Sequence, residues 1–445
     1  MYRATRKPVD TSESSTEPQT PDPVAVDPPR RGWRRWAMDT RPLRIPAYRR
    51  LWSSTIVTAV GSQLTAVAVP KQIFDDTGSS AWVGVSGAVA LVPLVVFALW
   101  GGSVADAVDR RVMLLFTNSG IALTSVGLFV QAAAGNRSVW VVLALLGVQQ
   151  ACFGLNSPAR GATIPRLVPV AQVAAANALN STVFGLGAVA GPLLAGALIP
   201  VLGLPTLYLI DSVMLLAAIY ACWRLPSLPP LPTDGGQRPA AGLASIVDGF
   251  RYIRLHTVLL VSFLADITAM VLGMPRALFP EMAERTFGDP PGGGTALGFL
   301  YAAIPLGTLI GGLFSGTFTR FRRQGAAVAV AIMVWGLAMA TFGLTSSLWL
   351  AVVCLAVGGA ADLVSMVFRN AMLQTAATDE MRGRMQGVYF VVVAGGPRLA
   401  DLLHGTMGDV VGPGLATTVG GLLVVAVIPL ILLRFPAFWR YRFTG

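Results

Sequence analysis

The sequence predicts an all-α membrane protein with twelve transmembrane helices, arranged as two related six-helix bundles. Three observations support this class: few charged residues, recurring apolar runs, and basic residues confined to alternate loops. Only 12% of the 445 residues are charged and 54% are apolar, whereas a soluble domain has roughly 25% charged residues. A chain of this composition has more apolar surface than a water-soluble core can bury.

The apolar runs recur from residue 51 to residue 434, and each can cross a hydrocarbon layer of about 30 Å as a helix. We expect spans at 52–72, 81–104, 112–133, 138–157, 175–200, 204–223, 256–278, 295–317, 325–345, 347–367, 385–406 and 413–434. The polar stretch between the sixth and seventh spans begins with proline and glycine at high density, which favours a linker over a helix. The expected organisation is a tail at 1–50, bundles at 51–224 and 255–434, a linker at 225–254 and a C-terminal tail at 435–445.

The two bundles carry related loops. The loop after the second span begins at Gly102 and the loop after the eighth begins at Gly312, a displacement of 210 residues (312 − 102). The loops after the fourth and tenth spans begin at Arg160 and Arg369, a displacement of 209 residues (369 − 160). Two unrelated loops with nearly equal displacements indicate a duplicated six-helix unit. Transporters commonly have this form, with a midplane site between the halves.

Basic residues predict the orientation of the chain. The N-terminal tail, the C-terminal tail and every second loop hold 28 of the 33 Lys and Arg residues. The opposite loops hold Lys71, Arg137, Arg276 and Arg285, and Arg398 falls inside a span. Because basic residues mark the cytoplasmic side, we expect a multi-pass protein of the cytoplasmic membrane with both termini in the cytoplasm.

The end of the N-terminal tail, 30–50, combines eight arginines with Trp33, Trp36 and Tyr48. Clustered arginines and aromatics fit either nucleic acid or an anionic membrane surface. We favour the membrane, because the first span follows directly and aromatic rings at headgroup level anchor such helices. Residues 11–29 have the composition of disordered segments. The expected partners are anionic lipid and a small-molecule substrate, without nucleic acid, for a protein that acts as a monomer.

The stretch GGSVADAVDRR at 101–111 lies between the second and third spans. A solvated turn would explain Arg110 and Arg111 but not Asp106. Because the helix dipole disfavours a carboxylate at a helix C-terminus, Asp106 is expected to have a partner elsewhere in the chain. The two interpretations differ in whether this loop acts in the conformational cycle.

The same segment resembles the helix 2–3 signature of the major facilitator superfamily, Gly-x-x-x-Asp-(Arg/Lys)-x-Gly-Arg-(Arg/Lys). The matching residues are Gly102, Asp106, Arg110 and Arg111, and the departures are Ala107 and Asp109. The resemblance implies the major facilitator fold, in which this aspartate engages the N-terminus of helix eleven and latches the outward-facing state. Here that terminus lies near Arg382 and Arg384.

The fifth span contains GAVAGPLLAG at 187–196. A Gly-x-x-x-Gly spacing lets transmembrane helices approach closely, so a packing face explains the pattern on its own. The pattern also resembles the superfamily's antiporter motif, with Gly187, Gly191, Pro192 and Gly196 matching and Ala195 departing. This resemblance implies an exporter that exchanges substrate for protons, with the proton-motive force in place of a cofactor. The two interpretations are compatible.

Longer stretches resemble the bacterial enterobactin exporters and their relatives. These stretches are 298–307, 372–375 with 382–384, and Arg276 with 279–283. The resemblance implies export of a siderophore or related amphipathic molecule across a bacterial cytoplasmic membrane. A multidrug or macrolide-type efflux pump is the alternative, and the sequence does not choose between the two.

Ionisable residues within spans cost roughly 2.5–3.5 kcal/mol each at mid-helix and should therefore face the bundle interior. Asp266 has no partner on its own helix and is our first candidate for proton coupling, followed by Asp211 and Asp362. Arg398 and Asp401 are three residues apart and form either a self-neutralising pair or a coupling site. We expect His404 to be a hydrogen-bonded packing residue and Lys71 to extend to the membrane interface.

Enzyme activity is not expected. A phosphate-binding loop needs lysine after glycine, but the chain has only Lys7 and Lys71, and neither follows glycine. The two histidines and three cysteines lack zinc-site spacing. We therefore expect no metal site and no ATP hydrolysis.

Overall fold

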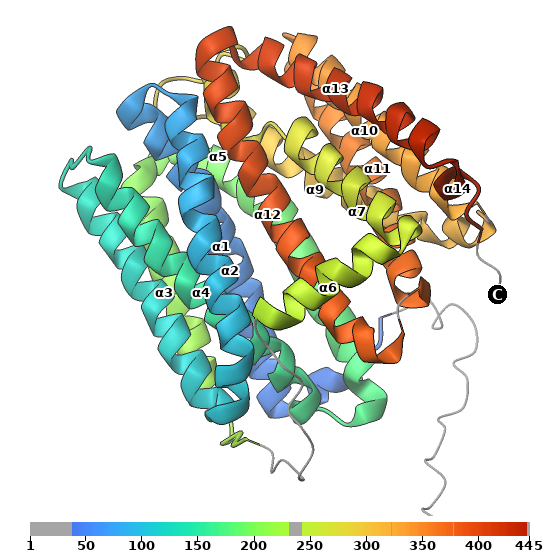
Figure 1. The fold of residues 1–445 in the computed structure, drawn as a ribbon. Coiled ribbons are helices and arrows are strands. Elements are labelled where there is room, and N and C mark those ends of the chain that lie inside the picture. Colours follow the sequence, from blue (N-terminus) through green and yellow to red (C-terminus); the bar gives the residue numbers. More distant parts are fainter. Residues whose placement is uncertain (1–37, 231–242, 322, 377, 443–445) are drawn as a thin grey trace, which may run out of the picture. The chain divides into compact units, whose positions relative to one another are not determined.

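The computed structural model describes residues 38–230, 243–321, 323–376 and 378–442. In the compact unit Thr40–Gly445, every regular element of the described ranges is a helix (Figure 1). The elements are η2 Arg41–Arg44, α1 Pro46–Thr77, α2 Ser80–Ala107, α3 Arg110–Ala133, α4 Val139–Leu167, η3 Val170–Gln172, α5 Val173–Trp223, α6 Leu243–Leu255, α7 Thr257–Gly273, η4 Arg276–Leu278, α8 Phe279–Arg285, α9 Thr295–Leu313, η5 Ser315–Arg320, α10 Gln324–Leu344, α11 Leu348–Ala376, α12 Asp379–Val411, α13 Pro413–Arg434 and α14 Pro436–Trp439.

The long helices follow the predicted spans. α5 has 51 residues, but Gly203, with φ 74° and ψ 161°, interrupts it between the predicted spans 175–200 and 204–223. Such a left-handed φ favours glycine, which lacks a Cβ. Within the described ranges, nine stretches are long and apolar enough to cross a membrane. α1 and α12, of 32 and 33 residues, have the length but carry more polar side chains.

The predicted seventh span, 256–278, is not one helix. α7 ends at Gly273, and Pro275 separates it from the short turn η4 and from α8. Because proline has no N–H to donate, it cannot continue the hydrogen-bond ladder of α7. Arg276 therefore lies in a turn between two helices.

Large apolar side chains are exposed on the outward faces of the helices. On α3, Phe116 is 69% exposed and Leu123 is 72% exposed, and Trp349 of α11 is 65% exposed. Exposing this much apolar surface to water would be unfavourable, whereas contact with the hydrocarbon layer of a membrane is favourable. The distribution agrees with a multi-pass membrane protein.

The helices form two groups that correspond to the predicted bundles. In the first group α1 packs on α5, α2 on α4, and α3 on both α4 and α5. In the second, α10 packs on α11 and α13, and α9 packs on α11. The groups meet where α2 lies along α12 and α5 lies along α9. α4 and α11, which the repeat places in equivalent positions, are both 29 residues long.

The predicted linker is partly helical. Residues 231–242 lie outside the described part of the chain, but α6 occupies the end of the range 225–254 and packs on α12. Its Ile253 is buried against α12 and α7 residues, whereas Val247 and Leu255 are exposed. The non-helical linker is therefore shorter than predicted, because the residues after the proline and glycine cluster form an amphipathic helix.

Consecutive long helices run in opposite directions, so their loops alternate between two ends of the helical unit. We call the end with Pro46 and Arg434 the near end, and the end with the turns at Gly78 and Gly412 the far end. Both of these far-end glycines have positive φ, of 66° and 87°. Gly78 ends α1 by donating its N–H to the carbonyl of Phe74 at 2.7 Å, as expected for a left-handed C-terminal cap.

Candidate functional site

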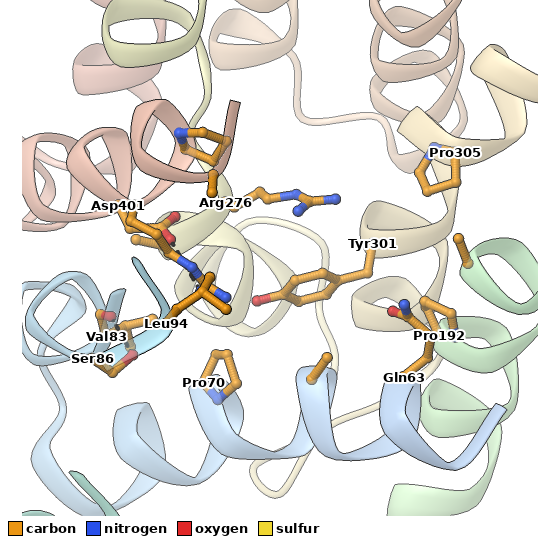
Figure 2. Close-up of a pocket in the computed structure, with 16 residues that line it drawn as sticks. Gln63, Pro70, Val83, Ser86, Leu94, Pro192, Arg276, Tyr301, Pro305 and Asp401 are labelled. Carbon is orange, nitrogen blue, oxygen red and sulfur yellow. Dashed lines mark hydrogen bonds and ion pairs between the residues drawn. The ribbon is translucent and has the colours of Figure 1, made fainter. Parts of the chain in front are cut away.

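A cavity of about 380 Å³ lies between the two groups of helices (Figure 2). Its walls come from α1, α2 and α5 in the first group and from η4, α9 and α12 in the second. The labelled wall residues in Figure 2 are Gln63, Pro70, Val83, Ser86, Leu94, Pro192, Arg276, Tyr301, Pro305 and Asp401. Prolines and aliphatic side chains supply apolar surface, and a few polar groups converge on it. This is the composition expected of a binding site for an amphipathic small molecule.

A second cavity of about 290 Å³ adjoins the first and is lined mainly by the first group of helices, with Arg398 of α12 also in its wall. The two share Gln63, Ala66, Pro70, Ser86 and Arg398 in their walls. The second cavity reaches deeper into the first group, where it is lined by Gln149, Gln150 and Asp211. The second cavity therefore forms a polar extension of the central cavity.

Asp211 lies in the wall of this polar extension. Its Oδ2 accepts hydrogen bonds from the hydroxyls of Thr65 at 2.7 Å and Ser125 at 2.8 Å. Gln149 in turn donates to the hydroxyl of Ser125 at 3.2 Å. Oδ1 of Asp211 is buried without a hydrogen-bond partner in the described ranges. The sequence-predicted candidate Asp211 is thus a buried carboxylate held by hydroxyl groups from α1 and α3.

Asp266 of α7 forms a buried ion pair with Arg369 of α11. Asp362, two helical turns before Arg369 on α11, lies 3.9 Å from the same guanidinium. Arg369 also donates from Nε to the hydroxyl of Ser365 at 3.1 Å. Two of the four predicted carboxylate candidates therefore share one cation, and the cluster carries one net negative charge when both are ionised.

The pair Arg398 and Asp401 is present, with Nη1 of Arg398 3.8 Å from Oδ2 of Asp401. Both residues line the central cavity. Close packing against α2 positions the aspartate: a Cβ on Gly87 would lie 2.9 Å from its Oδ2. His404, one turn further along α12, is 1% exposed and hydrogen-bonds through Nε2 to the carbonyl of Leu272 at 3.0 Å. This confirms His404 as a packing residue.

The glycines of the motif in α5 face two neighbours. A Cβ on Gly187 would lie 3.0 Å from the Cβ of Ala59 on α1, and Gly191 packs on Gln63 of the same helix. A Cβ on Gly196 would lie 2.7 Å from the Cα of Gly298 on α9, in the other group. Pro192 lines the central cavity. The motif thus forms a packing face for α1 and α9, and it places a proline in the cavity wall.

The loop between α2 and α3 is held by backbone and linker contacts. Asp109 caps α3: its Oδ1 accepts the backbone N–H of Arg111 at 2.8 Å and that of Leu228 at 3.1 Å. Arg110 donates to the carbonyl of Ala162 at 3.0 Å, and Arg111 to the carbonyl of Trp223 at 2.6 Å. Asp109, a departure from the signature glycine, therefore serves as a helix cap.

The latch residues are only partly described. Gly102 and Asp106 lie in α2, and the side chain of Asp106 is outside the described part of the structure. Arg384, near the start of α12, forms an ion pair with Asp248 of α6 at 3.2 Å. The predicted engagement of Asp106 with the start of α12 therefore stays a prediction.

The far ends of the two groups are tied together by polar contacts. Lys71 of α1 pairs with Asp75 and, at 3.0 Å, with Glu284 of α8. The hydroxyl of Ser80 donates to Glu281 at 2.6 Å, and its N–H donates to Asp409 of α12 at 2.8 Å. Lys71 is 1% exposed, so the expectation that it extends to the membrane interface is wrong.

The roles of two arginines and one tyrosine were not predicted from the sequence. Arg369 and Arg276 were expected in loops, whereas Arg369 is a buried ion-pair partner and Arg276 lines the central cavity. Tyr48 was expected at headgroup level, but its side chain is 1% exposed and its hydroxyl donates to the carbonyl of Ala176 at 2.8 Å. One signal was available: Arg369 follows Asp362 by two helical turns, which puts both on one face.

Comparison with known proteins agrees with this architecture. The family described as transmembrane secretion effector matches residues 37–440. The enterobactin exporter EntS of Shigella boydii serotype 18 is 30% identical over 392 residues, which cover 87% of this chain and 92% of the exporter. EntS of Escherichia coli O139:H28 is 29% identical over the same shares of both chains.

Solved transporter structures share the fold. The nucleoside transporter NupG matches with a TM-score of 0.71 at 13% identity, over 89% of this chain and 100% of that one. A bacterial homologue of the human lysosomal transporter Spinster matches with a TM-score of 0.66 at 16% identity, over 90% and 97%. The chain therefore belongs to the major facilitator superfamily, in its transmembrane secretion effector family, and is a multi-pass membrane transporter and not an enzyme.

Proposed function

We propose that the protein exports a siderophore or a related amphipathic small molecule across the cytoplasmic membrane of a bacterium. The central cavity carries this proposal, because it lies between the two groups of helices and combines apolar walls with a few charged groups. The relatives that are 29–30% identical are named enterobactin exporters. The α5 motif, with its resemblance to antiporters, supports the outward direction.

The near end faces the cytoplasm in this proposal. The loops at that end carry most of the basic residues, which marks the cytoplasmic side of a membrane protein. Both termini are then cytoplasmic, and the arginines at 30–50 contact anionic lipid. The far-end ties of Lys71 and Ser80 close the cavity toward the outside. The protein works as a monomer, since the cavity is complete within one chain.

Export is coupled to proton entry in this proposal. Asp266 and Asp362 share Arg369, so the cluster becomes neutral when one proton binds. Asp211 is a second position that one proton neutralises. Each lies in a different group of helices, and alternating access moves those groups against each other. Asp266 is the first candidate for the coupling residue, and Asp211 and Asp362 follow.

The latch completes the proposed cycle. The carboxylate of Asp106 engages the start of α12, where free N–H groups favour an anion, and stabilises the state that is closed at the near end. Asp106→Asn is expected to insert normally and to transport more slowly. Accessibility of a far-end cysteine reporter should fall in that variant. Unchanged accessibility with full transport would leave the loop a solvated turn.

A deletion strain tests the cargo. Under iron limitation, the strain should secrete less siderophore than its parent, and the chain carried on a plasmid should restore secretion. Sensitivity to hydrophobic antibiotics should stay unchanged. Raised antibiotic sensitivity with normal siderophore secretion would instead identify a multidrug efflux pump.

A further inference from the structure

The central cavity contains more positive than negative charge. Its walls hold Arg276 and Arg398, and Asp401 is the one carboxylate among the described residues that line it. Oδ2 of Asp401 lies 3.8 Å from Nη1 of Arg398. The charge of Arg276 is therefore not balanced by a second carboxylate in this wall. With these three groups ionised, the wall of this cavity has a net charge of one positive unit.

The side chain of Arg276 forms no hydrogen bond or ion pair of its own within the described ranges; it interacts with Asp401 only through longer-range electrostatics. Its Nε is buried. Figure 2 shows the side chain projecting into the cavity, as does that of Tyr301. A guanidinium left unpaired inside a membrane protein is costly, so a partner from outside the chain is expected.

The fold holds both arginines in position. Pro275 interrupts the backbone hydrogen bonds after α7, and Arg276 begins the turn η4. Ala277 and Leu278 of this turn are buried, which fixes the turn and holds Arg276 at the wall of the central cavity. Arg398 follows Pro397 on α12, where α2 packs closely through Gly84 and Gly87. Rigid placement of two guanidinium groups on separate elements suits recognition of one acidic group between them.

We propose that Arg276 and Arg398 form an anion subsite of the central cavity, and that the cargo is an amphipathic molecule with a carboxylate group. The apolar walls contact the rest of the cargo, and the ring of Tyr301 offers an aromatic surface to it. Asp401 forms an ion pair with Arg398. The acidic group of the cargo therefore competes with Asp401 for the guanidinium of Arg398. This inference rests on the proposed function and names the chemical class of its substrate.

Competition gives the two kinds of substitution opposite effects. Arg276→Gln or Arg398→Gln removes a cation that the cargo contacts and weakens binding of an acid. Asp401→Asn removes the competing carboxylate, keeps a side chain of the same shape, and strengthens binding of an acid. A purely structural role for these residues would lower binding in all three variants.

The test uses the purified full-length protein in lipid nanodiscs and isothermal titration calorimetry. The probes are 2,3-dihydroxybenzoate and its amide, which have nearly the same shape but differ by one charge. The wild-type protein should bind the acid at least about tenfold more tightly than the amide, as expected for a charge-assisted hydrogen bond. Arg276→Gln should remove that preference while it leaves binding of the amide unchanged, and Asp401→Asn should increase it.

Arg137→Gln is the matched control, because Arg137 is an exposed arginine in the far-end turn after α3. It should retain the preference of the wild-type protein. Equal or absent binding of the acid by the wild-type protein overturns the proposal, as does weaker acid binding by a folded Asp401→Asn variant. Because binding is measured without transport, a failed siderophore assay with a clear acid preference would refute the cargo alone. Normal siderophore export with no acid preference would refute the subsite alone.

Discussion

Gly196 of α5 and Gly298 of α9 pack directly against each other, and neither has room for a side chain. A Cβ on Gly196 would lie 2.7 Å from the Cα of Gly298, and a Cβ on Gly298 would lie 2.7 Å from the carbonyl oxygen of Pro192. Contacts below 3.0 Å with backbone atoms cannot be relieved by rotating a side chain. This contact joins the two groups of helices beside the central cavity.

Gly196→Ala should therefore disfavour the state that is closed at the far end. Overpacking of a close contact typically costs about 1–3 kcal/mol, which would shift the conformational equilibrium by roughly 5- to 150-fold. Accessibility of a cysteine placed at the far end should rise, and transport should slow. Gly185→Ala on the same helix is the control, since no atom lies within 4 Å of its added Cβ. Equal accessibility in the two variants would contradict the prediction.

Lys71 gives a second prediction for the far end. Lys71→Met removes the cation that pairs with Asp75 and Glu284 and keeps most of the side-chain volume. Removing one partner of a buried pair costs about 3–5 kcal/mol. We expect about 1–3 kcal/mol here, because Glu284 is 28% exposed and exposed pairs contribute less. The melting temperature should fall, and far-end accessibility should rise.

A double-mutant cycle with Glu284→Gln separates the ion pair from packing effects. The cost of Lys71→Met should be smaller when Glu284 is already neutral, because less carboxylate charge is left unpaired. Arg137→Met, at an exposed arginine of the same end, should change neither property. Additive effects of Lys71→Met and Glu284→Gln would show that the pair does not stabilise this end.

The stability of the near end is expected to depend on pH through Asp109. Burial would raise the pKa of Asp109, but hydrogen bonds from Ser227 and from the N–H groups of Arg111 and Leu228 outweigh burial and hold the pKa below its usual value of 3.8. A carboxyl group with a lowered pKa stabilises the fold above its unfolded-state pKa, and this contribution is lost as pH falls through the folded-state value. The cap should therefore weaken only in acid.

Asp109→Ala should lower stability by about 0.5–2 kcal/mol at neutral pH, the usual cost of losing a helix N-cap. The difference in melting temperature from wild type should shrink as pH is lowered below about 4. Ser227→Ala, which removes one of the donors to Asp109, should show a smaller loss in the same direction. A loss that is constant across this pH range would mean that the charge of Asp109 does not contribute.

The sequence predicted the helices well because membrane-spanning segments are read from local composition. α13 and the predicted span 413–434 share both bounds, and α10 differs from its prediction by one residue at each end. The left-handed turn at Gly203 inside α5 also falls where two spans were separated. Such features depend on residues that are neighbours in the chain.

Side-chain partners were harder to predict, because they depend on how helices pack. Asp266 was correctly found to lack a partner on its own helix, but its partner Arg369 lies four helices further along the chain. Arg369 was also assigned to a loop, since charge alone ended the predicted tenth span at 367, whereas α11 continues to Ala376. Arg276 does lie in a turn, but its position in the wall of the central cavity was not predicted. Apolar periodicity does not locate a charged residue that folds inward.

The last prediction concerns proton coupling. Moving one charge through 100 mV releases roughly 2.3 kcal/mol, and the carrier must bind the proton on one side and release it on the other. The cluster of Asp266, Asp362 and Arg369 carries one negative charge when both carboxylates are ionised. Asn at position 266 keeps the shape of the side chain but cannot bind the proton, and Asp362 remains beside Arg369.

Asp266→Asn is therefore expected to abolish uphill export driven by a proton gradient and to retain downhill counterflow, which needs only the motion of the two groups of helices. Both rates are measured in proteoliposomes with and without an imposed gradient. Thr268→Val is the control, because Thr268 is a half-buried residue of the same helix whose hydroxyl, within the described ranges, donates to the backbone carbonyl of Leu264. It should keep both activities. Uphill export at the normal rate in Asp266→Asn would reduce Asp266 to a structural ion-pair partner, and the same assay on Asp211→Asn and Asp362→Asn would then identify the coupling residue.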